Sequence, residues 1–195
     1  MDVFNENNFL FNEDTNNHLE TIVNSKMFAN GYIFYGTEGL GKRQAALEFT
    51  KKIFKQYNPS EKLEEKITNN NHPDLLIIEP GSIINGKKRR SSDNEILKAN
   101  FDVIKIDQIR NIKTFISQKS IESEKKIIII VDAHLLNEAS SNCLLKSLEE
   151  PINSIFILLT SKLNLLLDTI KSRCQLIQFK SLSKKEIDLF LKNNV

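Results

Sequence analysis

The stretch GTEGLGK, residues 36–42, matches the first seven positions of the phosphate-loop pattern G-x-x-x-x-G-K-[ST]. Such a turn between a strand and a helix points backbone N–H groups at a phosphate, and the helix N-terminus adds partial positive charge. The eighth position departs from the pattern, because Arg43 stands where a hydroxyl normally ligates magnesium. The candidate nucleotide-binding residues of this loop are Gly36, Gly39, Gly41 and Lys42. The alternative is a tight turn that keeps only the backbone shape.

A second element of a nucleotide site is expected where the apolar run Ile127–Val131 ends in Asp132. A carboxylate at the end of a parallel strand can hold magnesium through water, or it can simply cap the next segment. The following residue, Ala133, stands where many ATPases of this kind place a glutamate that activates water. The two elements together indicate a nucleotide-hydrolysing scaffold from which much of the hydrolytic chemistry is missing.

Apolar runs that alternate with helical patterns define the fold class. Strands are expected at residues 31–35, 74–79, 126–132, 154–160 and 174–179. Helices are expected through residues 18–23, from residue 42 onward, at 104–118, and from the N-cap Asn137 to Glu150, with Leu144, Leu145 and Leu148 facing inward. This alternation predicts a doubly wound α/β domain, with a five-stranded parallel sheet flanked by helices.

Three polar segments interrupt this pattern. Residues 59–71 are expected to form a connecting loop with a short helical piece. Residues 82–100 form a polar excursion whose basic run, Lys87–Arg90, either touches DNA phosphates or a partner's acidic surface or is a solvated loop. Residues 183–186 have the spacing of a capping box and are expected to open a last helix.

Composition sets limits on the class of protein. The chain has 195 residues, of which 40% are hydrophobic and 27% charged, so one well-buried globular domain is expected. A net charge of +2 predicts no strong affinity for nucleic acid or membranes, and no apolar stretch is long enough to span a bilayer. The acidic, polar start does not resemble a secretory signal. With only 2 cysteines, a reducing cytoplasm is the expected location.

Two further constellations are candidates for function. Thr160 and Ser161 end the fourth expected strand beside the phosphate loop, where they suit either a γ-phosphate sensor or hydroxyls that satisfy backbone groups. Arg173 lies in the sequence Ser-Arg-Cys just before the fifth strand, at the rim of the sheet. Its planar fork would suit a neighbouring subunit's γ-phosphate, whereas the simpler interpretation is a surface arginine with a carboxylate partner.

These motifs resemble a known family. The order of GTEGLGK, HPDLLIIEP, IDQIR, KIIIIVDAHLLNEASSNCLLKSLEEP, IFILLTS and IKSRCQLIQF is similar to the AAA+ domain of bacterial DNA polymerase III clamp-loader subunits. The similarity runs from about Asn30 to Phe179, and its most specific parts are Asn137–Pro151 and Ser172–Cys174. The altered residues Arg43 and Ala133 look more like the delta-prime subunit than the ATP-hydrolysing tau/gamma subunit.

The resemblance implies roles for particular residues. Arg173 would be the trans-acting arginine finger, and Thr160 and Ser161 would fall in the sensor-1 region. A delta-prime-like subunit is a comparatively rigid stator that does not hydrolyse ATP, so ATP with magnesium would be bound, if at all, without hydrolysis. The implied partners are the tau/gamma and delta subunits, which together load the ring-shaped sliding clamp on primer–template DNA.

The chain also departs from the family pattern. Many relatives carry a four-cysteine zinc module after the phosphate-loop helix, but residues 55–71 contain no cysteine, so no zinc is expected there. Residues 1–180 would form the AAA+ domain, and residues 181–195 would begin a helical lid. Because no collar domain follows in this sequence, a fragment, a truncated gene product or a reduced family member is expected.

Three hypotheses about function follow. The first is a largely non-hydrolysing stator of the clamp loader that donates Arg173 to a neighbour's ATP. The second is an active AAA+ ATPase of the tau/gamma kind, which requires magnesium-dependent turnover despite Arg43. The third is a binding-only remnant of the family that recognises partners without joining a loader.

Overall fold

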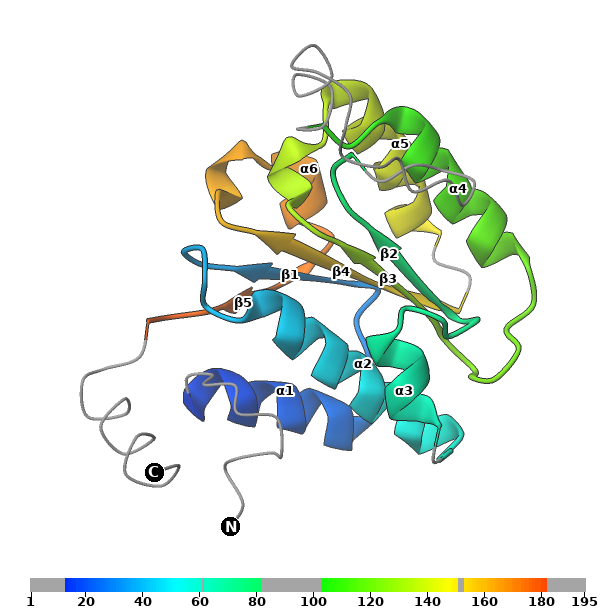
Figure 1. Cartoon of the computed structure of the whole chain (residues 1–195). Coiled ribbons are helices and arrows are strands. Elements are labelled where there is room, and N and C mark those ends of the chain that lie inside the picture. Colours follow the sequence, from blue (N-terminus) through cyan, green and yellow to red (C-terminus); the bar gives the residue numbers. More distant parts are fainter. Residues whose placement is uncertain (1–12, 61, 82–102, 151–152, 182–195) are drawn as a thin grey trace, which may run out of the picture.

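A parallel five-stranded sheet forms the centre of the molecule (Figure 1). The computed structural model describes residues 13–60, 62–81, 103–150 and 153–181. The strands are β1 (Gly31–Tyr35), β2 (Leu75–Ile78), β3 (Lys126–Ile130), β4 (Ser154–Thr160) and β5 (Gln175–Gln178), in the spatial order β2-β3-β4-β1-β5. The basic excursion at 82–100 and the helix expected from Ser183 lie outside the described residues.

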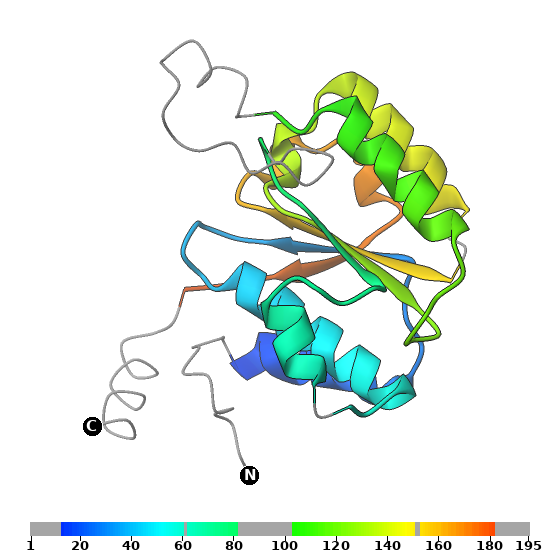
Figure 2. The same cartoon turned by 45° about the vertical axis from the view of Figure 1, so that its right-hand side comes forward.

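Helices cover both faces of the sheet (Figure 2). On one face lie α1 (Glu13–Ser25), α2 (Lys42–Tyr57) and α3 (Leu63–Thr68). On the other lie α4 (Ile106–Ser117), α5 (Glu138–Glu149) and the short α6 (Asp168–Lys171), with two 3₁₀ turns at Ala133–Leu135 and Leu163–Leu165. No helix within the described ranges is long and apolar enough to cross a membrane.

The two layers follow from the alternation of side chains along the strands. Ile127 and Ile129 of β3 pack in the core beneath α1, α2 and α3, whereas Ile128 and Ile130 pack against α4, α5 and α6. Every residue of β3 and β4 is buried, as the continuous apolar runs indicate for strands covered on both sides. The predicted fold class is therefore confirmed.

Element boundaries differ from prediction at a few points. The third strand ends at Ile130 rather than Asp132, because Asp132 adopts a left-handed conformation (φ 50°, ψ 49°) that starts a 3₁₀ turn. The fifth strand begins at Gln175, one residue later than expected. Leu145 is only partly buried, whereas Leu144 and Leu148 are fully in the core. Asn137 is the expected N-cap, and its side chain accepts a hydrogen bond from the Ser140 N–H at 2.8 Å.

A buried carboxylate closes the loop at the amino edge of the sheet. Asp74, fully buried just before β2, accepts hydrogen bonds from the backbone N–H groups of Ile121, Glu122 and Ser123 at 2.7–3.2 Å. The Asp74 N–H in turn donates to Nδ1 of His72 at 3.1 Å. This network fixes the loop between α4 and β3, because the Asp74 carboxylate accepts hydrogen bonds from three of its backbone N–H groups. An uncharged side chain at this position would form weaker hydrogen bonds.

His72 is held in the same network by an aromatic stack. Its ring lies 4.2 Å from the ring of Phe54, at an interplanar angle of 17°, and its side chain is 2% exposed. Burial lowers the pKa of His72, while the nearby Glu122 and Asp74 partly oppose this and Lys66 adds to it. His72 is therefore neutral at pH 7, as it must be to accept the hydrogen bond from Asp74.

Acidification is expected to destabilise the fold through His72. Because the folded pKa lies below the unfolded value of about 6.5, the unfolded chain binds a proton first as the pH falls. The contribution is fully present above about pH 6.5 and is lost as the pH falls towards the folded pKa. Urea unfolding between pH 7.5 and 5.5 should therefore show a flatter decline for His72→Asn, whose amide oxygen accepts the same bond without titrating. Identical slopes in the two proteins would contradict this assignment.

Candidate functional site

The predicted loop geometry is present between β1 and α2. Its three glycines all have positive φ: 150° at Gly36, 78° at Gly39 and 70° at Gly41. The Gly36 N–H donates to the Thr160 carbonyl at 3.3 Å, and the Phe179 N–H donates to the Tyr35 carbonyl at 2.7 Å. The loop therefore leaves the carboxyl end of β1 between β4 and β5, where the strands of an open parallel sheet place ligands.

Lys42 binds its own loop. Its Nζ donates to the Gly36 carbonyl at 2.8 Å and to the Thr37 carbonyl at 2.5 Å. Burial lowers the pKa of Lys42, and the carboxylates of Asp132 and Glu38 partly oppose this shift. An incoming phosphate would have to replace the two carbonyl contacts in order to use this ammonium group.

Arg43 forms an ion pair at the carboxyl end of β2. Its Nη1 lies 2.5 Å from Oε1 of Glu79, the residue that follows β2. The Arg43 side chain is 55% exposed, so this ion pair lies near solvent and is worth at most about 1 kcal/mol. The pair neutralises Arg43 and directs the guanidinium towards Glu79. Since a guanidinium has no lone pair to offer, this position cannot ligate a cation.

The end of β3 carries the expected carboxylate without the expected catalytic partner. Asp132 accepts the Leu135 N–H at its carbonyl, at 2.8 Å, and so begins the 3₁₀ turn. Ala133 is fully buried, so its methyl group packs in the core, and this residue offers no group that could activate water. Burial lowers the pKa of Lys42 and the carboxylate of Asp132 partly opposes this, so Asp132 lies at the same edge of the sheet as the loop.

Thr160 is committed to groups of its own chain. It is fully buried at the end of β4, its Oγ1 accepts the Lys162 N–H at 3.0 Å, and it lies 3.2 Å from Nδ1 of His134. Burial lowers the pKa of His134, and neutral imidazole nitrogen can accept the Thr160 hydroxyl proton. Ser161 donates to Glu38 at 3.4 Å. The contact between His134 and Thr160 was not predicted, although His134 follows β3 and Thr160 ends the neighbouring strand β4.

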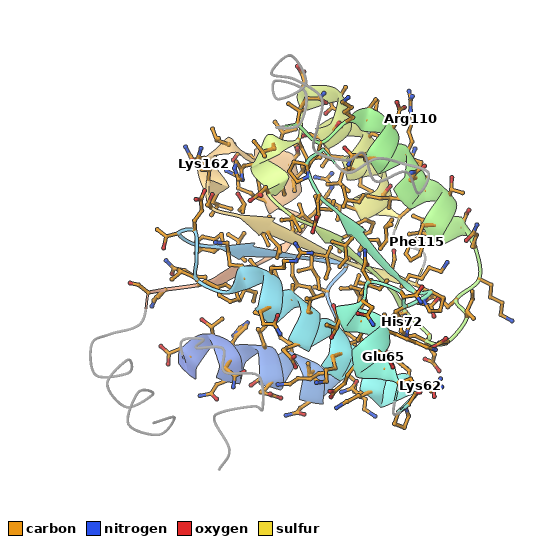
Figure 3. The ribbon with its side chains drawn as sticks, in the orientation of Figure 1. Lys62, Glu65, His72, Arg110, Phe115 and Lys162 are labelled. Atoms are coloured by element: carbon orange, nitrogen blue, oxygen red, sulfur yellow. The ribbon has the colours of Figure 1, made fainter. Side chains whose placement is uncertain are left out.

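Arg173 lies at the opposite edge of the sheet from the loop. It precedes β5, whose register pairs Gln175 with Tyr32 near the start of β1. The five residues of β1 therefore separate Arg173 from its own phosphate loop by about 17 Å, at roughly 3.3 Å per residue. Figure 3 labels one residue at each of these edges, Lys162 after β4 at the carboxyl edge and His72 before β2 at the amino edge.

The polypeptide around Arg173 is anchored by Cys174. A Cβ added at Gly31 would lie 2.6 Å from the Cys174 sulfur, so only glycine allows this approach. Burial raises the pKa of Cys174 to about 12, which makes the thiol an unreactive packing group. Arg173 itself is 36% exposed, with Nη2 2.7 Å from Oε1 of Glu149 and Nη1 donating to the Thr169 carbonyl at 2.9 Å. The simpler prediction, a carboxylate partner, is thus seen.

The candidate residues accordingly fall into two groups. Those at the carboxyl edge, around the loop, are Gly36, Gly39, Gly41, Lys42, Asp132, Thr160 and Ser161. Arg173 stands apart at the amino edge. Within the described ranges, no group of three or more His, Cys, Asp or Glu side chains is arranged to hold a metal ion. The arrangement therefore separates a phosphate-loop edge from an arginine edge.

The strand order, the glycine loop after β1 and the polar residues at the carboxyl edge define a P-loop protein of the AAA+ class. The chain belongs to the DNA polymerase III clamp-loader family, because residues 11–183 match the family described as DNA polymerase III, delta subunit. It is 32% identical over 172 residues to the DNA polymerase III subunit delta′ of Bacillus subtilis, covering 85% of this chain and 46% of that protein. The delta-prime-like resemblance inferred from the motifs is thereby confirmed.

Other relatives support the same family and fold. Identity to the tau subunit of Bacillus subtilis is 30% over 176 residues, covering 87% of this chain and 28% of that protein. A DNA polymerase III gamma subunit-related protein of Thermotoga maritima superposes with a TM-score of 0.61 at 26% identity, covering 88% of this chain and 48% of that one. The RuvB branch migration motor of the same species shares the fold. It superposes with a TM-score of 0.59 at 16% identity, covering 92% of this chain and 49% of that one. The chain spans less than half the length of these relatives.

Proposed function

We propose that this chain is a largely non-hydrolysing stator of a clamp loader, which supplies Arg173 to the ATP site of a neighbouring subunit. The observation that carries the proposal is the position of Arg173. It is partly exposed at the sheet edge that faces away from its own phosphate loop. A guanidinium placed there cannot reach a nucleotide on the same chain, so it can act on γ-phosphate charge only in another subunit.

The loop edge supports the non-hydrolysing half of the proposal. Arg43 pairs with Glu79 where a magnesium ligand would stand, and buried Ala133 replaces a water-activating carboxylate. Lys42 and Thr160 are both engaged by groups of this chain. Nucleotide bound at the loop would therefore lack the metal coordination and water activation that phosphoryl transfer needs.

The proposed partners follow from the family. A tau/gamma-type ATPase would receive Arg173, and a delta-type subunit would complete the loader in the cytoplasm. Contact with the sliding clamp and primer–template DNA would be indirect. The proposal gives ATP and magnesium no catalytic role at this chain's own loop, and it includes no zinc.

The test is a titration of the purified chain with labelled ATP, with and without magnesium, followed by a turnover assay. We expect no steady turnover in either condition, whether or not ATP binds. Magnesium-dependent turnover would overturn the stator proposal and favour an active ATPase of the tau/gamma kind.

Lys42→Ala gives a second result that discriminates between these functions. In a loader reconstituted from this chain and its tau/gamma and delta partners, ATP turnover should stay within about twofold of wild type. The reason is that Lys42 contacts its own loop carbonyls and serves no catalytic step. The equivalent lysine of the tau/gamma partner serves as the control, since its replacement should abolish turnover at that subunit. A loss of comparable size from Lys42→Ala would mean that this chain hydrolyses ATP.

A further inference from the structure

Both outer nitrogens of the Arg173 guanidinium are occupied within its own chain. Nη2 lies 2.7 Å from Oε1 of Glu149, and Nη1 donates to the Thr169 carbonyl at 2.9 Å. These are the two donors that a planar guanidinium would present side by side to a phosphate. The arginine is therefore folded back on α5 and α6 and does not extend freely from the surface.

The helix that supplies the carboxylate favours this position. Glu149 is the last residue of α5, and the unpaired carbonyls at a helix C-terminus carry partial negative charge. A cation is stabilised at such a terminus, and here the carboxylate of Glu149 adds a full charge to it. The Thr169 carbonyl fixes the other side of the fork, so that two elements share in orienting Arg173.

The contact is nevertheless easy to exchange. The side chains of Arg173 and Glu149 are 36% and 50% exposed, and an ion pair so close to solvent is weak. A phosphate group offers more charge and can accept two parallel hydrogen bonds from the same fork. A γ-phosphate presented by a neighbouring subunit would therefore displace the carboxylate.

We propose that Glu149 is a positioning residue that holds Arg173 against its own subunit until the neighbour's nucleotide replaces it. The inference rests on the proposed function. It adds that the contact with Glu149 keeps Arg173 from acting until the neighbour's nucleotide is in place. Removal of the Glu149 charge should free the arginine, so that the neighbouring ATP site is stimulated before the loader is fully assembled on clamp and DNA.

The test compares Glu149→Gln with Glu150→Gln. Glu150 is the next residue, carries the same charge and is exposed, and the described residues pair Arg173 with Glu149 only. In the isolated chain, the NMR signals of the Arg173 Nη–H groups, which contact Glu149 and the Thr169 carbonyl, should shift and exchange faster with water in Glu149→Gln but not in Glu150→Gln. In the reconstituted loader without clamp or DNA, Glu149→Gln should raise the partner's ATP turnover by about two- to fivefold, the range that an exposed ion pair can provide.

The outcomes separate this inference from the proposed function. An unchanged Arg173 signal in Glu149→Gln, or a fall in the partner's ATP turnover, would overturn the positioning role. The proposed function could still hold in that case, because Arg173→Ala tests separately whether the arginine is needed. If Arg173→Ala leaves the partner's turnover unchanged, the proposed function fails, and the positioning role fails with it. Urea unfolding of both glutamine variants would establish that neither result reflects a loss of fold.

Discussion

Arg173→Ala is expected to reduce hydrolysis at the neighbouring ATP site by about 10³-fold, the lower end of what a trans-acting arginine contributes to phosphoryl transfer. The guanidinium would neutralise charge that develops on the γ-phosphate, which alanine cannot do. The effect should be read in a loader whose other ATP sites carry inactive phosphate loops, so that the signal reports only the site beside this chain. The purified chain should keep its free energy of unfolding within about 1 kcal/mol, because the ion pair that it loses is near solvent.

Two matched substitutions make this result specific. Arg173→Lys keeps the positive charge but loses the planar fork, so it should restore only a small part of the activity. Arg110→Ala removes another exposed arginine with an aspartate partner, the Arg110–Asp107 pair within α4 (Figure 3), and should leave turnover unchanged. Wild-type turnover in Arg173→Ala would mean that the chain is a binding-only member of the family or acts through other residues.

The fold could be predicted largely because its central strands are apolar throughout. Runs such as Ile127–Ile130 are too short to form helices and too apolar to form an exposed edge strand. They are therefore expected in the middle of a parallel sheet. The bounds of β1 and β4 were predicted correctly for the same reason. The four-residue helix α6 was not predicted, because so short a helix has no apolar periodicity.

The end of β3 shows where local pattern fails. Val131 and Asp132 continue the apolar run and its expected carboxylate, but the ladder to β2 ends at Ile130. Asp132 then adopts a left-handed conformation, which aspartate tolerates better than most residues. Hydrophobic patterning does not encode this change of backbone direction, so the strand was predicted two residues too long.

The candidate site was predictable in position but not in its contacts. Asp132 follows β3 and Thr160 ends β4. Because the carboxyl ends of these parallel strands meet at one edge, the sequence places both residues beside the glycine loop. The pairs Arg43–Glu79 and Arg173–Glu149 join elements far apart in the sequence. Which carboxylate each arginine meets depends on side-chain reach across the folded surface, and no motif records it. The expected domain limits at residues 180 and 181 stay predictions.

Gly36→Ala is expected to destabilise the fold by about 3–5 kcal/mol, the second largest effect in this chain. An alanine Cβ at Gly36 would lie 2.2 Å from the Phe179 carbonyl oxygen, and the residue's φ of 150° is itself strained for alanine. Phe179 has little room to move, because its N–H donates to the Tyr35 carbonyl and its ring packs 5.3 Å from that of Phe34. The cost combines backbone strain with overpacking against a fixed carbonyl.

Gly39→Ala is the matched control within the same loop. Gly39 also has a positive φ, 78°, but a Cβ there would meet nothing within 4 Å. It should cost only about 1 kcal/mol of backbone strain in urea unfolding. Equal costs at the two positions would mean that the loop moves away from β5 and that the close approach to Phe179 does not constrain it. Suppose that Gly36→Ala strongly lowers the free energy of unfolding while Lys42→Ala leaves ATP turnover unchanged. The loop would then be required for its backbone shape, and the charge of Lys42 would not be required for catalysis.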